Sequence, residues 1–135
     1  MNQQQIELIQ QSWQQVLPIK LQAAELFYNR LFELDPSLKP MFKGDIKEQG
    51  DKLMLTLTIA INSLTKLETL IPVLENMAIR HIGYGVQDHH YQTVGQALID
   101  TLAKAFGEAF TSELKQAWLT MYNTVADVMI NATKK

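Results

Sequence analysis

Apolar residues recur every three or four positions along nearly the whole chain, and this spacing is what most constrains the fold. The first segment carries Ile6, Ile9, Trp13 and Val16 on one stripe, the pattern of an amphipathic helix. No segment alternates convincingly with the period of two expected for a half-buried strand. Because 135 residues, 47% of them hydrophobic, suffice for one core but not for a second catalytic domain, the sequence predicts one all-α domain over residues 1–135.

The helix boundaries follow from prolines and polar segments in the first half of the chain. Pro18 is expected to end the first helix or to open the next one. The second helix stops at Asp35, because a residue that precedes a proline is pushed out of the helical region. Residues 43–50 are polar and contain two glycines, which predicts a mobile connection. The next helix is expected to start near Glu48.

The second half of the chain has equally clear boundaries. A connection at residues 63–69 precedes a helix that is expected to end before Gly83. Asp88 and Thr111 are suitable N-caps for the two helices that follow, which are separated at Gly107. The sequence therefore predicts six or seven helices with short connections.

His81 lies on the apolar stripe of a predicted helix, on the same face as Leu74 and Ala78. One interpretation is that its imidazole is the axial ligand of a haem iron inserted between helices. The other is an ordinary core histidine, which is the commoner case for a single histidine on an apolar face. The helix upstream also carries a polar residue, Gln49, on an otherwise largely apolar stripe.

Composition excludes several classes of protein. The net charge is -2 and the twelve lysines and arginines are scattered, which argues against binding to nucleic acid. The absence of cysteine excludes disulfides, thiolate metal sites and a thioether-linked haem, so any haem is held non-covalently. Neither a signal peptide nor a membrane span is recognisable, and we expect a cytoplasmic protein.

Several motifs in combination resemble the globin family over essentially all of the chain. They are Phe27-Tyr28-x-x-Leu31-Phe32, then Pro36, Phe42 and Gln49, and finally His81-x-x-x-Gly85-Val86-x-x-x-His90-Tyr91-x-x-Val94-Gly95. More narrowly, the chain looks like the bacterial single-domain globins of the Vitreoscilla type and the haem domain of flavohaemoglobins. The resemblance implies a globin fold, in which a three-over-three helical sandwich encloses a haem pocket.

The resemblance also implies roles for individual residues. His81 is then the proximal ligand of the iron in haem b, and Phe42 packs against the haem face. Tyr28 and Gln49 are the distal hydrogen-bond donors to bound dioxygen. Because Gly50 weakens the helix next to Gln49, we expect Tyr28 to be the more firmly held donor.

Further residues are expected around the haem. Tyr91 matches a family tyrosine beside the proximal imidazole. Thr133 stands where flavohaemoglobins have a glutamate, and the loss of that glutamate is expected to weaken peroxidase-like chemistry. Lys52 and Arg80 are candidate partners of the haem propionates, although solvated surface charges are an equally good interpretation. The candidate wall residues, which are equally compatible with an ordinary core, are Leu53, Leu57, Val86, Val94 and Leu98.

His89 and His90 follow each other at a predicted helix start. Adjacent helical residues point about 100° apart, so the two imidazoles are not expected to share one metal. One of them is interpreted as a helix cap or as a hydrogen-bond partner of a neighbouring ligand.

The function implied by the resemblance is reversible binding of dioxygen for storage, delivery or scavenging, by a monomer or weak homodimer. The alternative is a nitric-oxide dioxygenase, which needs an external reductase because 135 residues hold no flavin or nicotinamide domain. A ligand sensor normally carries a fused output domain, and a helical interaction module without haem is the remaining alternative.

Overall fold

The computed structural model describes residues 2–41, 46–83 and 88–132, and it gives only the backbone of Met41, Ile46, Leu67, residues 81–83 and Asp88. Within these residues every regular element is a helix, as predicted. The α-helices are α1 (Gln3–Val16), α2 (Lys20–Leu34), α3 (Ile46–Asn62), α4 (Leu67–Gly83), α5 (Asp88–Phe106) and α6 (Ser112–Ala132). The described residues also include the short 3-10 helices η1 (Leu17–Ile19), η2 (Pro36–Met41) and η3 (Gly107–Ala109).

Local caps account for several helix ends. Asn2 and Gln5 form a reciprocal capping box at the start of α1, in which each side chain accepts a hydrogen bond from the other residue's backbone. The predicted cap Thr111 is confirmed, because its hydroxyl accepts from the backbone N–H of Leu114 at 3.2 Å. α2 ends at Leu34, one residue before the predicted stop. Pro18 lies within η1, between the first two α-helices.

The predicted connection at residues 43–50 is wrong over its second half, because α3 already begins at Ile46. Residues 43–45 lie outside the described part of the chain. Gly50 is buried in the second turn of α3, and a Cβ at this position would lie 3.0 Å from the Cβ of Ala24 in α2. The close crossing of α2 and α3 therefore offsets the low helix propensity of glycine.

α4 also begins earlier than predicted, at Leu67 rather than after residues 63–69, and it includes Pro72 and Gly83. Leu70 and Leu74 are almost fully buried. Their packing stabilises the first turns of α4 in spite of the proline.

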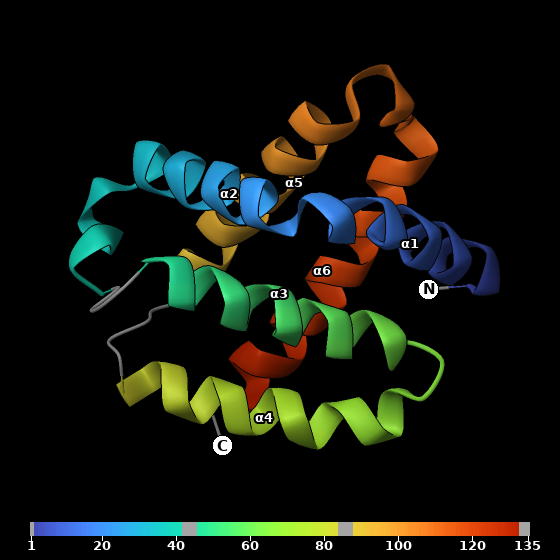
Figure 1. Ribbon diagram of the computed structural model, residues 1–135. Helices are drawn as coiled ribbons and strands as arrows, with labels where there is room; N and C mark the ends of the chain where they lie inside the picture. The colour runs from blue at the N-terminus through green and yellow to red at the C-terminus, as the bar shows by residue number, and fades with distance from the viewer. Residues whose placement is uncertain (1, 42–45, 84–87, 133–135) are drawn as a thin grey trace.

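The arrangement of the helices places α3 next to α4. In Figure 1 the two run side by side and antiparallel, with α2 on the other side of α3. α2 contacts both α3 and α5, and α4 contacts α6. In the same view α6 passes behind the space between α3 and α4.

The main core is centred on two buried tryptophans, Trp13 of α1 and Trp118 of α6, whose ring centroids lie 6.0 Å apart. Both indole N–H groups are satisfied. Trp118 donates to the hydroxyl of Ser12, and Trp13 donates to the hydroxyl of Thr58 in α3, each at 3.0 Å. These bonds link α1, α3 and α6 into one frame.

Candidate functional site

Tyr28 and Gln49, the two predicted distal donors, lie together where α2 meets α3. The hydroxyl of Tyr28 donates to the backbone carbonyl of Gln49 at 3.2 Å. The Tyr28 ring is only 4% exposed and packs against the rings of Phe27 and Phe32, with centroids 5.2 and 6.1 Å away. Burial raises the pKa of Tyr28 to about 12. The phenol is therefore a positioned group that keeps its proton at neutral pH.

Gly50 allows the approach that brings these two residues together. A Cβ atom added at Gly50 would lie 3.0 Å from the Cβ of Ala24 in α2 and 3.9 Å from the Tyr28 ring. In the sequence this glycine suggested a loosely held helix start. In the structure it is a contact residue inside α3.

An open cavity of about 350 Å³ lies between α3 and α4. Leu70, Leu74 and Met77 give it an apolar wall, and the cations Lys52 and Arg80 also line it. The two basic residues proposed from the sequence as propionate partners thus border one cavity from opposite helices. His81 occupies the last turn of α4, one turn after Met77, and its side chain lies outside the described part of the structure.

The apolar residues predicted to form the pocket wall are only partly grouped. Leu53, Leu57 and Leu98 line one interior void of about 10 Å³, bounded also by Phe27. Val94 packs against the same main core. These positions have the contacts of ordinary core residues as well as of a pocket wall. Phe42 and Val86 lie outside the described residues.

Tyr91 packs against a smaller core cluster that includes Leu74 and Ala78 of α4, and therefore lies beside the helix that carries His81. Its backbone carbonyl accepts a hydrogen bond from the hydroxyl of Tyr122 in α6. Burial raises the pKa of Tyr122, so this phenol too remains a donor. The predicted replacement at Thr133 falls outside the described residues.

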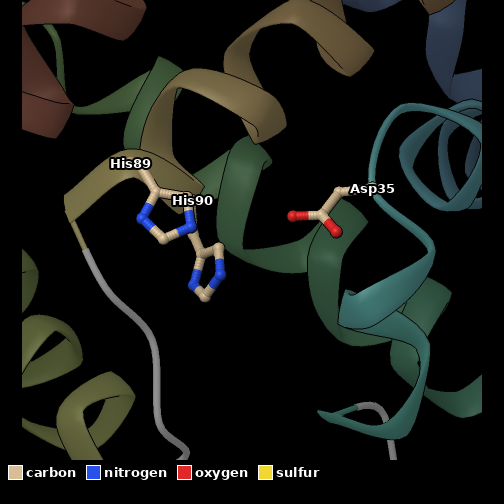
Figure 2. A group of neighbouring side chains, drawn as sticks. All are labelled: Asp35, His89 and His90. Atoms are coloured by element: carbon tan, nitrogen blue, oxygen red, sulfur yellow. The ribbon is translucent and has the colours of Figure 1, made fainter.

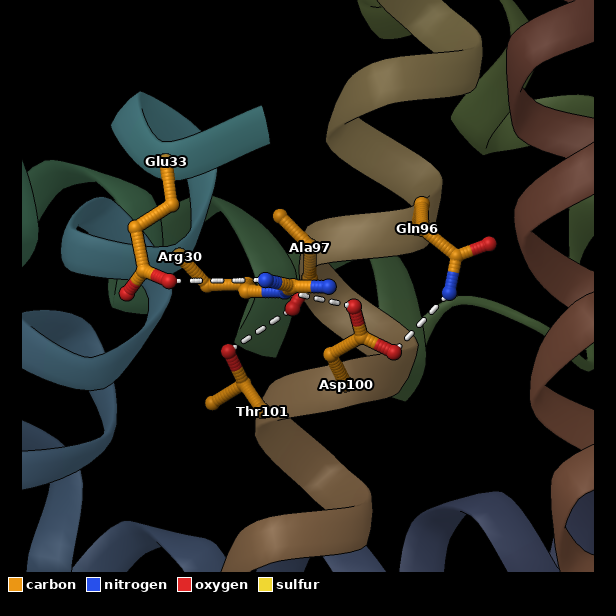
Figure 3. Close-up of polar contacts among 6 residues, drawn as sticks. All are labelled: Arg30, Glu33, Gln96, Ala97, Asp100 and Thr101. Carbon is orange, nitrogen blue, oxygen red and sulfur yellow. Dashed lines mark hydrogen bonds and ion pairs between the residues drawn. The ribbon is translucent and has the colours of Figure 1, made fainter. Parts of the chain in front are cut away.

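An ion pair that sequence patterns did not reveal joins α2 to α5. The Nε of Arg30 lies 2.8 Å from Oδ2 of Asp100, and a second guanidinium nitrogen of Arg30 lies 3.5 Å from the Glu33 carboxylate (Figure 3). The other carboxylate oxygen of Asp100 accepts a hydrogen bond from the side-chain amide of Gln96. The hydrogen bond to Asp100 raises the pKa of Arg30. Arg30 is two residues from Tyr28, so the ion pair joins this part of α2 to α5.

The expectation that the rings of His89 and His90 point apart is wrong. Their centroids lie 4.3 Å apart with the planes tilted by 58°, because side-chain rotation compensates for the different directions of the two Cβ atoms. Asp35, at the end of α2, faces the pair (Figure 2). Burial lowers the pKa of His90, with a smaller contribution from His89, whereas Asp35 acts in the opposite direction.

None of the described helices is both long and apolar enough to cross a membrane.

Known globins are similar to this chain in sequence and in structure. The family model described as "Globin" matches residues 25–129. The neuroglobin of Danio rerio is 34% identical over 142 aligned residues, covering 95% of this chain and 89% of the relative. The neuroglobin of Dissostichus mawsoni is 31% identical, covering 91% and 86%. The sequence resemblance to flavohaemoglobins and Vitreoscilla-type proteins stays a prediction.

Among solved structures, a bacterial globin from Campylobacter jejuni superimposes with a TM-score of 0.85. The alignment covers 98% of this chain and 96% of that one, at 24% sequence identity. The likeness confirms the predicted fold, a three-over-three arrangement of helices.

Proposed function

The chain belongs to the globin family, and we propose that it binds dioxygen reversibly at a non-covalent haem b whose axial ligand is His81. Membership of the family implies haem binding and, in general, haem-based binding of dioxygen. The identity of the haem, the ligand role of His81 and the roles of Tyr28 and Gln49 are our proposals.

The chemistry of the cavity between α3 and α4 is compatible with a haem. A haem is a flat apolar ring system with two carboxylates at one edge, so it needs apolar walls and cations nearby. The cavity offers apolar side chains from α4, and Lys52 and Arg80 contribute a positive charge from each helix. When bound, the haem supplies the iron that takes a diatomic ligand.

The observation that carries the proposal is the buried, protonated Tyr28 hydroxyl beside Gln49. A hydroxyl has a single proton, which rotation about the C–O bond redirects from the Gln49 carbonyl to a nearby acceptor. Bound dioxygen has partial negative charge, so it competes well with a backbone carbonyl for this proton. The aromatic neighbours of Tyr28 hold the ring in place during the exchange.

We expect Tyr28→Phe to raise the dioxygen dissociation rate about tenfold, because it removes a hydrogen bond worth about 1.4 kcal/mol and leaves the ring packing intact. Gln49→Leu is expected to have a smaller effect on release. Stopped-flow measurements on both variants compare the rates. In the unsubstituted protein the release rate is expected to stay constant up to about pH 10, since the phenol keeps its proton.

Tyr122→Phe is the matched control, because it removes another phenol hydroxyl, partly buried on α6, that is bonded to a backbone carbonyl. Its dioxygen release is expected to resemble that of the unsubstituted protein. If Gln49→Leu accelerates release more than Tyr28→Phe, the amide rather than the phenol is the main donor.

The nitric-oxide dioxygenase alternative uses the same site, and repeated turnover separates the two functions. With a flavin reductase and its reduced nicotinamide, the oxygenated protein is expected to consume about one equivalent of nitric oxide per haem and then to stop. Nitrate formed continuously at a rate that follows the reductase concentration would instead favour the enzyme.

A further inference from the structure

Asp35, His89 and His90 bring three metal-binding groups together outside the haem position. One ligand atom from each lies within 4.8 Å of the other two. Asp35 directly follows the last residue of α2, and the two histidines lie in the first turn of α5 (Figure 2). The three groups therefore join two segments that are far apart in the sequence.

The carboxylate is already oriented. Its Oδ1 accepts hydrogen bonds from both the backbone N–H and the hydroxyl of Ser37, an arrangement that fixes a ligand from behind. Its second oxygen, Oδ2, makes no hydrogen bond to the described residues. His90 is 6% exposed and its ring is confined, whereas His89 is exposed and free to adjust.

Two imidazoles and a carboxylate are the ligand set of many three-ligand zinc sites, in which water fills the fourth position. Ligand atoms at about 2.1 Å from a tetrahedral ion lie roughly 3.4 Å from one another. Closing the cluster from 4.8 Å requires a small side-chain rotation, for which exposed His89 has room. Hard ions such as Mg²⁺ prefer oxygen ligands and are a poor match.

We propose that Asp35, His89 and His90 form a binding site for a divalent transition metal, with Zn²⁺ as the principal ion. The bound ion clips the end of α2 to the start of α5, in addition to the Arg30–Asp100 pair. It also fixes the backbone directly before Tyr91.

The test is a calorimetric titration of the untagged, haem-loaded protein with Zn²⁺ and, separately, with Mg²⁺. The chain has three histidines, and with His81 occupied by haem any imidazole ligand must come from His89 or His90. We expect one Zn²⁺ per chain, a rise in the thermal unfolding temperature with Zn²⁺, and no measurable binding of Mg²⁺.

Asp35→Asn and His89→Ala are the informative variants, because neither residue is part of the buried core. Each is expected to weaken Zn²⁺ binding by at least about tenfold. Glu33→Gln is the matched control, since it removes an exposed carboxylate two residues away and is expected to leave the affinity unchanged. The proposal would be overturned if Asp35→Asn and His89→Ala bound Zn²⁺ as tightly as the unsubstituted protein. It would also be overturned if Glu33→Gln weakened Zn²⁺ binding as much as those two variants do.

Discussion

His81→Ala is expected to abolish stable haem binding, or to leave a weakly held haem that free imidazole restores. The iron loses its protein ligand in this variant. Burial of the ring system, at about 25 cal/mol per Å² of apolar area, still favours some association. The measurement is the ratio of Soret to protein absorbance after gel filtration, followed by the rate at which haem is lost to an excess of a haem acceptor.

His89→Ala is the matched control for this experiment, because it removes an exposed imidazole from the neighbouring helix. It is expected to retain haem as the unsubstituted protein does. Full haem occupancy in His81→Ala would contradict the assignment of the proximal ligand. If haem were lost only from His89→Ala, the proximal ligand would instead be His89 of α5.

Gly95→Ala is expected to destabilise the folded state by about 1 to 3 kcal/mol, which is the usual cost of overpacking a core. A Cβ at this position would lie 2.6 Å from Cε2 and 2.9 Å from Cδ2 of Tyr122. The ring has little freedom to move, because its hydroxyl is bonded to the carbonyl of Tyr91 on the same helix as Gly95. The α5–α6 contact must therefore open.

Equilibrium unfolding in urea measures this effect. Gly50→Ala is a useful comparison, because its added Cβ would lie 3.0 Å from Ala24 and at an ordinary contact distance of 3.9 Å from the Tyr28 ring. The gain in helix propensity of about 1 kcal/mol partly offsets the tight contact with Ala24. We expect a smaller change at residue 50 than at residue 95. Unaltered stability of Gly95→Ala would show that Tyr122 repacks without cost.

Local patterns were sufficient to predict most of the helices. The stripe Ile6, Ile9, Trp13 and Val16 is buried throughout, because periodicity reports directly which face of a helix is apolar. The cap at Thr111 was equally predictable, since a cap depends on residues within one turn.

Features that depend on distant contacts were not predictable in the same way. Residues 46–50 are helical, and Gly50 packs closely against Ala24 of another helix. Local helix propensity carries no information about such a contact. Arg30 and Asp100 are paired across two helices, and the sequence offers no signal for this choice of partner. The close approach of the tilted His89 and His90 rings depends on their rotamers.

The candidate site was partly predictable for a different reason. Tyr28 and Gln49 were selected by resemblance to the globin family, and the structure places them in contact. Lys52 and Arg80 were selected as cations close to Gln49 and His81 in the sequence, and both line one cavity. The role of each residue towards a haem remains a prediction that the variants described above test.

We propose above that this chain binds haem and, through it, dioxygen reversibly. The most direct measurement is the absorbance spectrum of the purified, haem-reconstituted protein, recorded after reduction, after equilibration with dioxygen and after its removal under argon. We expect one haem per chain, a five-coordinate ferrous spectrum, a distinct oxygenated spectrum, and full return to the ferrous spectrum under argon. Absence of a Soret band after reconstitution, or a ferrous spectrum that dioxygen leaves unchanged, would contradict it.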